Sequence, residues 1–171
     1  KKMEIDEKVV GLKFFNVYGP NEYHKGEMRS VINKAYEQIT AAGEVSLFKS
    51  YKEEYKDGEQ KRDFIYVNNA VEMILHFFEN NEKNGLFNVG TGTARTWNDL
   101  VTAIFKVLGK TPKINYIDMP EGMRDKYQYF TQADIEKIRN AGYSKPITSL
   151  EEGIKDYITN YLQKNKYIGL S

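Results

Sequence analysis

The stretch that decides the fold reads Val9-Val10-Gly11-Leu12-Lys13-Phe14-Phe15-Asn16-Val17-Tyr18-Gly19-Pro20. The part from Val9 to Phe15 is apolar on both faces of an extended chain, which predicts a buried strand of a parallel sheet covered by helices. The Tyr-Gly-Pro turn ends that strand, and polar and basic residues follow it. In open α/β sheets, ligands bind just beyond the carboxyl ends of the strands. We therefore expect part of the protein's chemistry to lie between Asn16 and Lys34.

Apolar periodicity predicts that strands and helices alternate along the rest of the chain. We expect strands at residues 9–15, 45–48, 63–67, 85–92 and 114–117, and helices at residues 28–42, 70–78, 96–108, 131–142 and 149–162. A polar loop is expected at 49–61, where Asp57-Gly58 is a turn signal. Because no repeat or linker composition divides the chain, we expect one α/β domain with a mainly parallel sheet.

Several helix ends carry residues with strong capping preferences. Gly43 is expected to end the first helix. Thr96 followed by Asp99, and Ser149 followed by Glu152, have the spacing of a capping box. Thr131 is expected to cap the helix that ends at Gly142.

Composition excludes several classes of function. A net charge of +1 argues against a nucleic-acid-binding protein, which usually has a basic face or tail. No apolar run has membrane-spanning length, and the first residues do not resemble a signal peptide. Cysteine is absent, and two histidines, His24 and His76, are too few for a metal cluster. His76 falls on an apolar helical pattern and is expected to be a packed residue. We expect a cytoplasmic protein with no metal, membrane or nucleic-acid partner.

Three motifs in order identify a resemblance. They are Phe-Phe-Asn-Val-Tyr-Gly-Pro at 14–20, Arg-Asp-Phe-Ile-Tyr-Val at 62–67 and Phe-Asn-Val-Gly-Thr-Gly at 87–92. Together they resemble the carboxyl-terminal half of the extended short-chain dehydrogenases/reductases that act on nucleotide sugars. Two more specific pieces, His-Lys-Gly-Glu-Met at 24–28 and Tyr-Gln-Tyr-Phe-Thr-Gln-Ala-Asp at 127–134, resemble the branch of that family that epimerises an ADP-heptose.

The resemblance implies a particular part of a fold. Residues 1–171 would supply the carboxyl-terminal part of an NADP-binding Rossmann-type parallel sheet, interleaved with a small α/β substrate-binding domain. The family's Gly-rich cofactor fingerprint and its Tyr-x-x-x-Lys pair do not occur in this sequence. Gly90-Thr91-Gly92 lies too late in the chain for that fingerprint and reads better as a tight turn. We therefore expect the amino-terminal cofactor-binding half to be absent, and a homo-oligomer for the intact enzyme.

The resemblance also implies an activity. It is the interconversion of ADP-D-glycero-D-manno-heptose and ADP-L-glycero-D-manno-heptose by NADP-dependent oxidation and re-reduction at C6, for lipopolysaccharide core synthesis. Lys25 matches a candidate catalytic base that also contacts the cofactor, and Val17 matches a residue whose backbone meets the cofactor. A lysine serves as a base only where its surroundings favour the neutral amine. The alternative for Lys25 is an exposed lysine in a turn, and for Val17 a role in forming the turn.

The remaining predicted site residues match substrate contacts. Asn16 matches a sugar contact, Arg62 a diphosphate contact and Tyr127 a contact to the diphosphate or sugar. Phe48, Lys49, Ser50 and Tyr51 match a segment that binds adenine, ribose and phosphate, and the register beyond Tyr51 is open. Glu27 and Lys34 are also predicted contacts, although relatives often have a small residue and a histidine at these two positions. The alternatives are a turn role for Asn16, a solvated Lys34, an ion pair of Arg62 with Asp63, and packing of Tyr127 under the next helix.

Two other functions remain open from the sequence. One is a different nucleotide-sugar epimerase, reductase or dehydratase of the same family. The other is a sugar-nucleotide-binding or oligomerisation module without catalysis.

Overall fold

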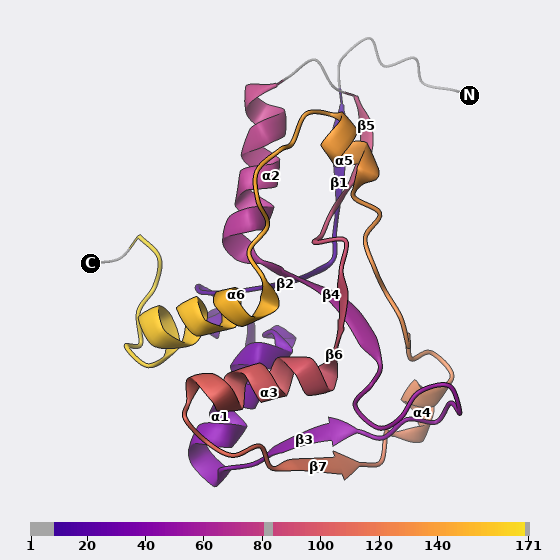
Figure 1. Cartoon of the computed structure of the whole chain (residues 1–171), viewed down its shortest axis with the longest axis vertical. Helices are drawn as coiled ribbons and strands as arrows, with labels where there is room; N and C mark the ends of the chain where they lie inside the picture. Colours follow the sequence, from indigo (N-terminus) through magenta and orange to yellow (C-terminus); the bar gives the residue numbers. More distant parts are fainter. Residues whose placement is uncertain (1–8, 81–83, 170–171) are drawn as a thin grey trace.

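The computed structural model describes residues 9–80 and 84–169. Figure 1 shows an elongated molecule with three short sheets along its length. In the first sheet, β1 (Val10–Phe14) pairs in parallel with β5 (Gly85–Val89). In the second, β4 (Lys61–Tyr66) lies between β2 (Asn16–Tyr18), which is parallel to it, and β6 (Ala94–Thr96), which is antiparallel. In the third, β3 (Val45–Phe48) pairs in parallel with β7 (Ile114–Ile117).

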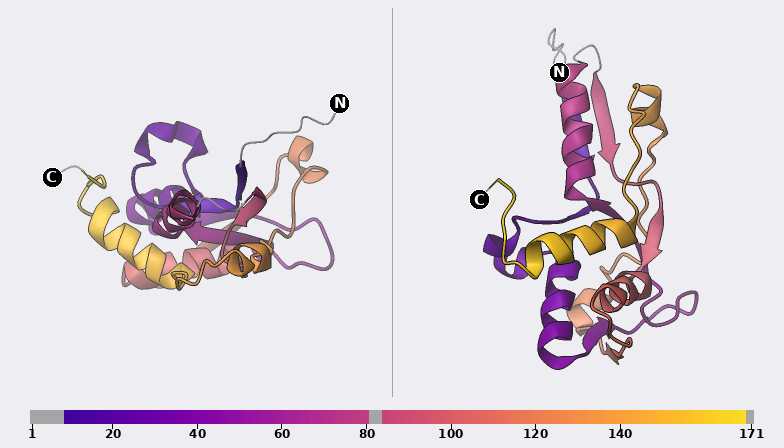
Figure 2. Two further views of the ribbon diagram at one scale, coloured as in Figure 1. Left: turned by 90° about the horizontal axis from the view of Figure 1, so that it is seen from above. Right: turned by 60° about the vertical axis from the view of Figure 1, so that its left-hand side comes forward.

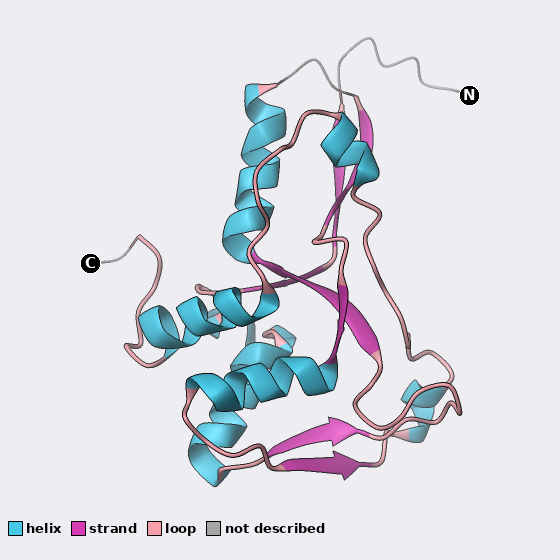
Figure 3. Ribbon diagram, in the orientation of Figure 1, coloured by secondary structure: helices cyan, strands magenta, loops and turns pink. Residues whose placement is uncertain are grey.

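The helices join and cover these sheets (Figure 3). A 3₁₀ helix, η1, precedes α1, and the last helix α6 continues into a π-helical turn, η2. Their bounds are η1 Tyr23–Met28, α1 Val31–Ala42, α2 Val67–Glu79, α3 Trp97–Val107, α4 Glu121–Arg124, α5 Glu136–Asn140, α6 Leu150–Asp156 and η2 Tyr157–Leu162. None of the helices in the described ranges is long and apolar enough to cross a membrane.

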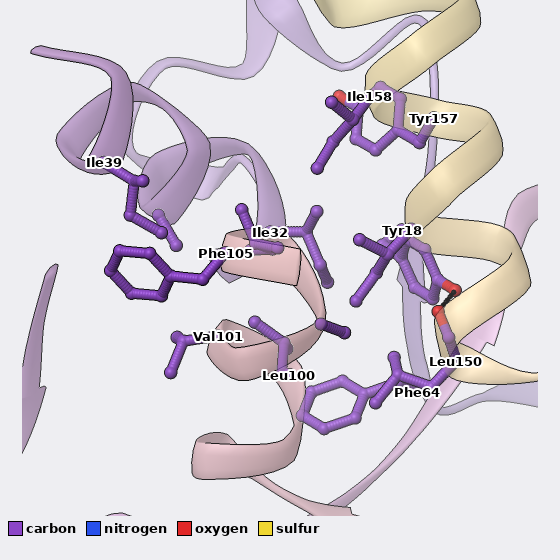
Figure 4. Packing of buried hydrophobic residues seen from close by; sticks show 14 of the residues in the cluster. Tyr18, Ile32, Ile39, Phe64, Leu100, Val101, Phe105, Leu150, Tyr157 and Ile158 are labelled. Carbon is purple, nitrogen blue, oxygen red and sulfur yellow. Dashed lines mark hydrogen bonds between the residues drawn. The ribbon is translucent and has the colours of Figure 1, made fainter. Parts of the chain in front are cut away.

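The main hydrophobic core lies where α1, α3 and α6 meet the middle sheet. Ile32 and Ile39 of α1, Leu100 and Phe105 of α3, and Ile154 of α6 are almost fully buried there. Figure 4 shows these helices around the core, with the Tyr18 hydroxyl donating to the backbone oxygen of Leu150 at 3.3 Å. This packing fixes α1 and α3, which carry walls of the two cavities described below.

A second core packs α2 and α5 against the β1–β5 pair, as the two further views in Figure 2 also show. Met73 and Phe77 of α2 contact Phe87 and Val89 of β5, and Ile138 of α5 closes the cluster. His76 is half-buried beside it, and its Nε2 lies 3.2 Å from the backbone oxygen of Ala141. The prediction of a packed histidine is therefore confirmed.

Most predicted elements are present, and the α/β class with parallel strand pairs is confirmed. Gly43 ends α1 in the left-handed conformation with φ of 75°. Both predicted capping boxes form, at Thr96 with Asp99 and at Ser149 with Glu152. These features depend on a few neighbouring residues, which is why the sequence reveals them.

Two expectations about the first strand were wrong. The strand is not buried on both faces, because β5 is its one strand neighbour among the described residues, and Phe14 remains 46% exposed. The Tyr-Gly-Pro turn also does not end the extended chain directly after Phe15. Asn16–Tyr18 instead forms β2, which leaves β1 and pairs with β4 in another sheet.

Two expectations about helices were also wrong. Met28 does not belong to the buried stripe of α1, because the helix begins at Val31 and Met28 is 87% exposed in η1. Thr131 caps no helix. Its backbone N–H donates to the backbone oxygen of Lys61, so this part of the chain runs along β4 and α5 starts only at Glu136.

Candidate functional site

Two adjoining cavities lie between the middle sheet, α1 and the β3–β7 pair. The first, here called the Lys25 cavity, has a volume of about 360 Å³ and lies at the β1–β2 junction and the 22–32 segment. The second, here called the Tyr127 cavity, has a volume of about 410 Å³ and is bounded by α1, β3 and the end of β7. Val31 and Trp97 line both cavities, so together they form one continuous candidate site.

The Lys25 cavity brings together three of the predicted residues. Asn16 and Val17 enter it because β2 pairs with Phe64 and Ile65 of β4, which fixes the direction of that short strand. Lys25 enters it from η1, whose helical path is broken at Gly26 with φ of 53°. Glycine adopts this left-handed conformation without steric cost, so the chain can turn directly after Lys25.

Arg62 is a buried cation with no carboxylate partner in the described part of the chain. Its residue is 8% exposed, and its guanidinium donates to the backbone oxygens of Lys61 and Gln128. The guanidinium carbon lies 5.3 Å from the ring centre of Tyr127 and 5.8 Å from that of Trp97. Burial lowers the pKa of Arg62, while the nearby Tyr127 opposes that shift. A buried guanidinium that lacks an anion is suited to a ligand that brings one, such as a diphosphate.

The alternative role for Arg62, an ion pair with Asp63, is excluded by the geometry of Asp63. This carboxylate is fully buried, and its oxygens accept from the backbone N–H groups of Thr91, Gly92 and Ala133 and from the Thr91 hydroxyl. The two side chains leave opposite faces of β4, as successive strand residues do. Asp63 therefore secures the 91–92 turn and the 127–134 segment, and Arg62 is left for the site.

Tyr127 and Trp97 form the wall between the two cavities and the cation. The Trp97 indole Nε1 donates to the Tyr127 hydroxyl at 3.0 Å, and both rings line the Tyr127 cavity. Burial raises the pKa of Tyr127, against the opposing effect of Arg62. The neutral hydroxyl can therefore still donate to a ligand oxygen, so packing and ligand contact are compatible for Tyr127.

Lys34 lines the Tyr127 cavity, but Glu27 lines neither cavity. The Lys34 ammonium pairs with the Glu27 carboxylate at 3.1 Å and donates to the Glu27 backbone oxygen. The Glu27 side chain is 94% exposed, so this ion pair contributes little to stability. Lys34 is therefore neither simply solvated nor free, and a ligand anion would compete with Glu27 for it.

The predicted adenine-binding segment is only partly at the site. Phe48 lines the Tyr127 cavity. Lys49, Ser50 and Tyr51 line neither cavity and instead bind the neighbouring loops. Lys49 pairs with Asp118 at 3.2 Å, the Tyr51 hydroxyl donates to the same carboxylate at 2.8 Å, and the Ser50 N–H donates to Asp57 at 2.7 Å.

Sequence reasoning missed two residues of the site. Trp97 was expected only as an apolar residue of the helix after Thr96, yet it lines both cavities and contacts Arg62. Its being the sole tryptophan, at the first position of a capped helix, was an available signal. Glu22 was quoted within a motif without a role, yet it lines the Lys25 cavity and is only 4% exposed. A buried carboxylate cannot be recognised from a polar turn sequence alone.

The site therefore combines one amine, one buried guanidinium and an aromatic, largely apolar cavity. Such an arrangement can hold a ring system against apolar walls and an anion near Arg62. It places the polar groups of Asn16 and Lys25 in the adjoining cavity, where a second part of the same ligand would lie.

Comparison with known proteins gives the family of this chain. Residues 3–90 match the model of the NAD dependent epimerase/dehydratase family. Two curated relatives are named ADP-L-glycero-D-manno-heptose-6-epimerase. The one from Nitratidesulfovibrio vulgaris (strain DP4) is 56% identical over 154 residues, and the one from Fusobacterium nucleatum subsp. nucleatum is 51% identical over 160 residues. Each match covers 90% of this chain and 48% of the relative.

A solved structure agrees with these matches. The crystal structure of Helicobacter pylori ADP-L-glycero-D-manno-heptose-6-epimerase superposes with a TM-score of 0.75 at 34% identity, covering 90% of this chain and 44% of that one. The chain belongs to the NAD dependent epimerase/dehydratase family. It is similar to the ADP-L-glycero-D-manno-heptose-6-epimerases over most of its length, and it spans about half the length of the curated relatives that it matches.

Proposed function

We propose that this chain is the substrate-binding, carboxyl-terminal half of an enzyme that interconverts ADP-D-glycero-D-manno-heptose and ADP-L-glycero-D-manno-heptose. The observation that carries the proposal is the 56% identity over 154 residues to a relative of that name, over a chain whose cavities contain the matching residues. Residues 1–171 would combine the last strands of the cofactor-binding sheet with the substrate-binding domain. The intact enzyme, meaning the longer protein containing this chain, would be a cytoplasmic homo-oligomer that serves lipopolysaccharide core synthesis.

The two cavities divide the substrate between them. Arg62 would bind the diphosphate, because its guanidinium is desolvated and has no competing carboxylate. The adenosine would lie in the Tyr127 cavity against Phe48, with the Tyr127 hydroxyl and the Lys34 ammonium at its edge. Lys49, Ser50 and Tyr51 would contact it only after their present bonds to Asp118 and Asp57 rearrange.

The heptose would then extend into the Lys25 cavity. Asn16 is placed to hydrogen-bond a sugar hydroxyl, and Glu27 could reach the sugar only from the exposed rim of η1. Lys25 would take the proton from the C6 hydroxyl and return it, as a general base and then a general acid. The exposed position of Lys25 in η1 leaves its amine free to approach either orientation of the sugar end.

A nicotinamide cofactor fits this part of the chain. Val17 and Lys25 line one cavity, so Val17 would meet the cofactor while Lys25 would lie between it and the sugar. When bound, the cofactor, here proposed to be NADP, supplies hydride acceptance and return at C6. The protein's part is to orient the C6–H bond and exclude water, which the apolar walls formed by Val31 and Trp97 favour.

The test is a turnover assay on the intact enzyme. With NADP present, ADP-D-glycero-D-manno-heptose should convert to a mixture of the two C6 epimers, measured by NMR or anion-exchange chromatography. The same assay should be run with NAD and with UDP- and GDP-sugars. Turnover of one of those sugars with none of the heptose would refute the proposed substrate. A sequence upstream of residue 1 without a Gly-rich fingerprint and a Tyr-x-x-x-Lys pair would refute the proposed place of this chain in the enzyme.

Lys25→Met tests the proposed base. Loss of general acid–base catalysis typically costs about a hundredfold or more in kcat, while ADP affinity should stay nearly unchanged. Lys155→Met is the matched control, because Lys155 is exposed on α6 and lines neither cavity. Equal activity of the two variants would show that Lys25 is only a turn residue.

A further inference from the structure

The segment that carries Lys25 has little regular structure of its own. Between β2 and α1 the chain forms one short 3₁₀ helix, which is interrupted at Gly26, and no residue of η1 is buried. One backbone bond, from the Lys25 N–H to the Glu22 oxygen at 3.0 Å, holds Lys25 within the segment. A side chain on such a segment keeps one position only if the flanking residues are held from outside.

Glu22 holds the segment at its start. Its carboxylate is almost fully buried and accepts from both donors of Ser30, the backbone N–H and the hydroxyl, each at 2.6 Å. Ser30 is also the N-cap of α1 and accepts from the Asn33 N–H. Glu22 therefore joins the two ends of the Lys25 segment to each other and to the first turn of α1.

Tyr157 connects this carboxylate to the end of the chain. It is fully buried at the first position of η2, and its hydroxyl donates to Glu22 Oε1 at 2.8 Å while accepting from the Asn33 amide at 2.9 Å. Burial and then the negative charge of Glu22 raise the pKa of Tyr157, so its hydroxyl stays protonated and remains a donor. All donors and acceptors of this small network are therefore matched.

The residues after η2 hold the same segment from the outside. The Asn21 side chain pairs with the backbone of Ile168, donating to its oxygen at 3.4 Å and accepting from its N–H at 2.8 Å. The Tyr23 ring packs edge-on against Tyr167, with ring centres 4.9 Å apart, and its hydroxyl donates to the Lys166 oxygen at 3.4 Å. Residues 157–168, here called the C-terminal clamp, thus contact three consecutive residues before Lys25.

We propose that Glu22 is a positioning residue which, together with the C-terminal clamp, fixes the segment that carries Lys25 against the Lys25 cavity. The inference rests on the proposed function only for what Lys25 does there. Glu22 does not touch the reacting atoms in this account, and its role is exerted through the backbone of residues 22–30. The last helix of the chain, far from the site in sequence, thereby contributes to the geometry of catalysis.

The first test needs no activity. Hydrogen exchange, measured by mass spectrometry, should be at least tenfold faster in residues 23–30 of Tyr157→Phe and Glu22→Gln than in the wild type. Tyr66→Phe is the matched control, because it removes a hydroxyl that donates to Asp156 at 2.6 Å on the same helix but does not contact the segment. Unchanged exchange at residues 23–30 in both variants would overturn the proposal.

A third variant covers the case in which a buried change prevents folding. Asn21 is exposed and has a left-handed φ of 70°, so Asn21→Gly removes the pair with Ile168 without straining the backbone. Exchange in residues 23–30 should rise about threefold, since one contact of the clamp is lost and the Glu22 network stays. Exchange equal to that of the wild type would show that the clamp does not hold the segment.

The second test uses turnover by the intact enzyme. Displacing a catalytic group by about 1 Å can cost up to a hundredfold, so kcat of Tyr157→Phe should fall about tenfold with KM unchanged. A higher KM at unchanged kcat, or full activity despite faster exchange, would overturn the positioning role. If the wild type shows no epimerase activity, the proposed function fails, and the exchange experiment alone decides whether the clamp exists.

Discussion

Replacing Asp63 by asparagine should destabilise the protein strongly, although the two side chains have nearly the same size. The Asp63 carboxylate is fully buried and accepts four hydrogen bonds. One oxygen accepts from the Thr91 N–H and hydroxyl, both at 2.8 Å, and the other from the N–H groups of Gly92 and Ala133 at 2.9 and 3.0 Å. An amide has one acceptor oxygen, so its NH₂ group must face two of these donors.

The cheaper orientation of the amide sets the minimum cost. If the NH₂ group faces Thr91, the hydroxyl can rotate to accept from it, and only the Thr91 N–H loses its partner. A buried donor without a partner costs about 1–3 kcal/mol, and the two remaining bonds lose the contribution of a charged acceptor, about 1 kcal/mol each. The free energy of unfolding should therefore fall by about 3–5 kcal/mol, a large part of the usual total of about 5–15 kcal/mol.

Urea unfolding followed by circular dichroism measures this change. Asp134→Asn is the control, because Asp134 is exposed, accepts only from the Glu136 N–H at 2.9 Å, and asparagine serves equally well in that turn. The control should change the free energy of unfolding by less than about 0.5 kcal/mol. A loss below about 1 kcal/mol for Asp63→Asn would refute the reasoning, since it would mean that the four donors find other acceptors.

Two further predictions concern α6. The hydrogen bond from Arg95 lowers the pKa of Glu151, burial opposes the shift, and the two residues join β6 to α6. Because the folded pKa lies below the unfolded one, this stabilisation is present above the unfolded value and is lost as pH falls through the folded value; the difference in unfolding free energy between wild type and Arg95→Met should therefore be largest near neutral pH and shrink below about pH 4, and a constant difference would contradict this. Gly153→Ala should destabilise despite the better helix propensity of alanine, which is worth about 1 kcal/mol, because its Cβ would lie 2.2 Å from the buried Tyr18 hydroxyl and overpacking costs about 1–3 kcal/mol. Gly122→Ala, with nothing within 4 Å of the added Cβ, is the control; equal melting temperatures for the two variants would show that Tyr18 yields freely.

The local features of the chain were open to prediction from the sequence alone. The Thr96 and Ser149 capping boxes and the left-handed Gly43 stop each depend on residues within one helical turn, so neighbouring residues suffice to specify them. The α/β class follows from alternating apolar periods in the same way. Motif spacing also placed Asn16, Val17 and Lys25 at one location, because a strand end and the turn that follows it are adjacent in the chain.

Tertiary structure decided what depends on partners distant in sequence. Thr131 has the composition of a helix cap, yet pairing with Lys61 draws it along β4. Phe14 looks like a buried strand residue, but its exposure depends on which strands and helices cover β1. A sequence pattern cannot weigh such long-range contacts, because their free energy arises only when the segments have met.

The same distinction holds for the candidate site. The sequence suggested that Arg62 binds an anion, but only the fold shows that Asp63 is occupied elsewhere and that Trp97 and Tyr127 enclose the guanidinium. It likewise gave no reason to link Glu22 with Tyr157, which lie 135 positions apart. The sequence by itself determined the helix caps, the α/β class and the residues that can do the chemistry. The packing of β4, α3 and α6 decided which of those residues are desolvated and held in place, since burial is a property of the assembled chain.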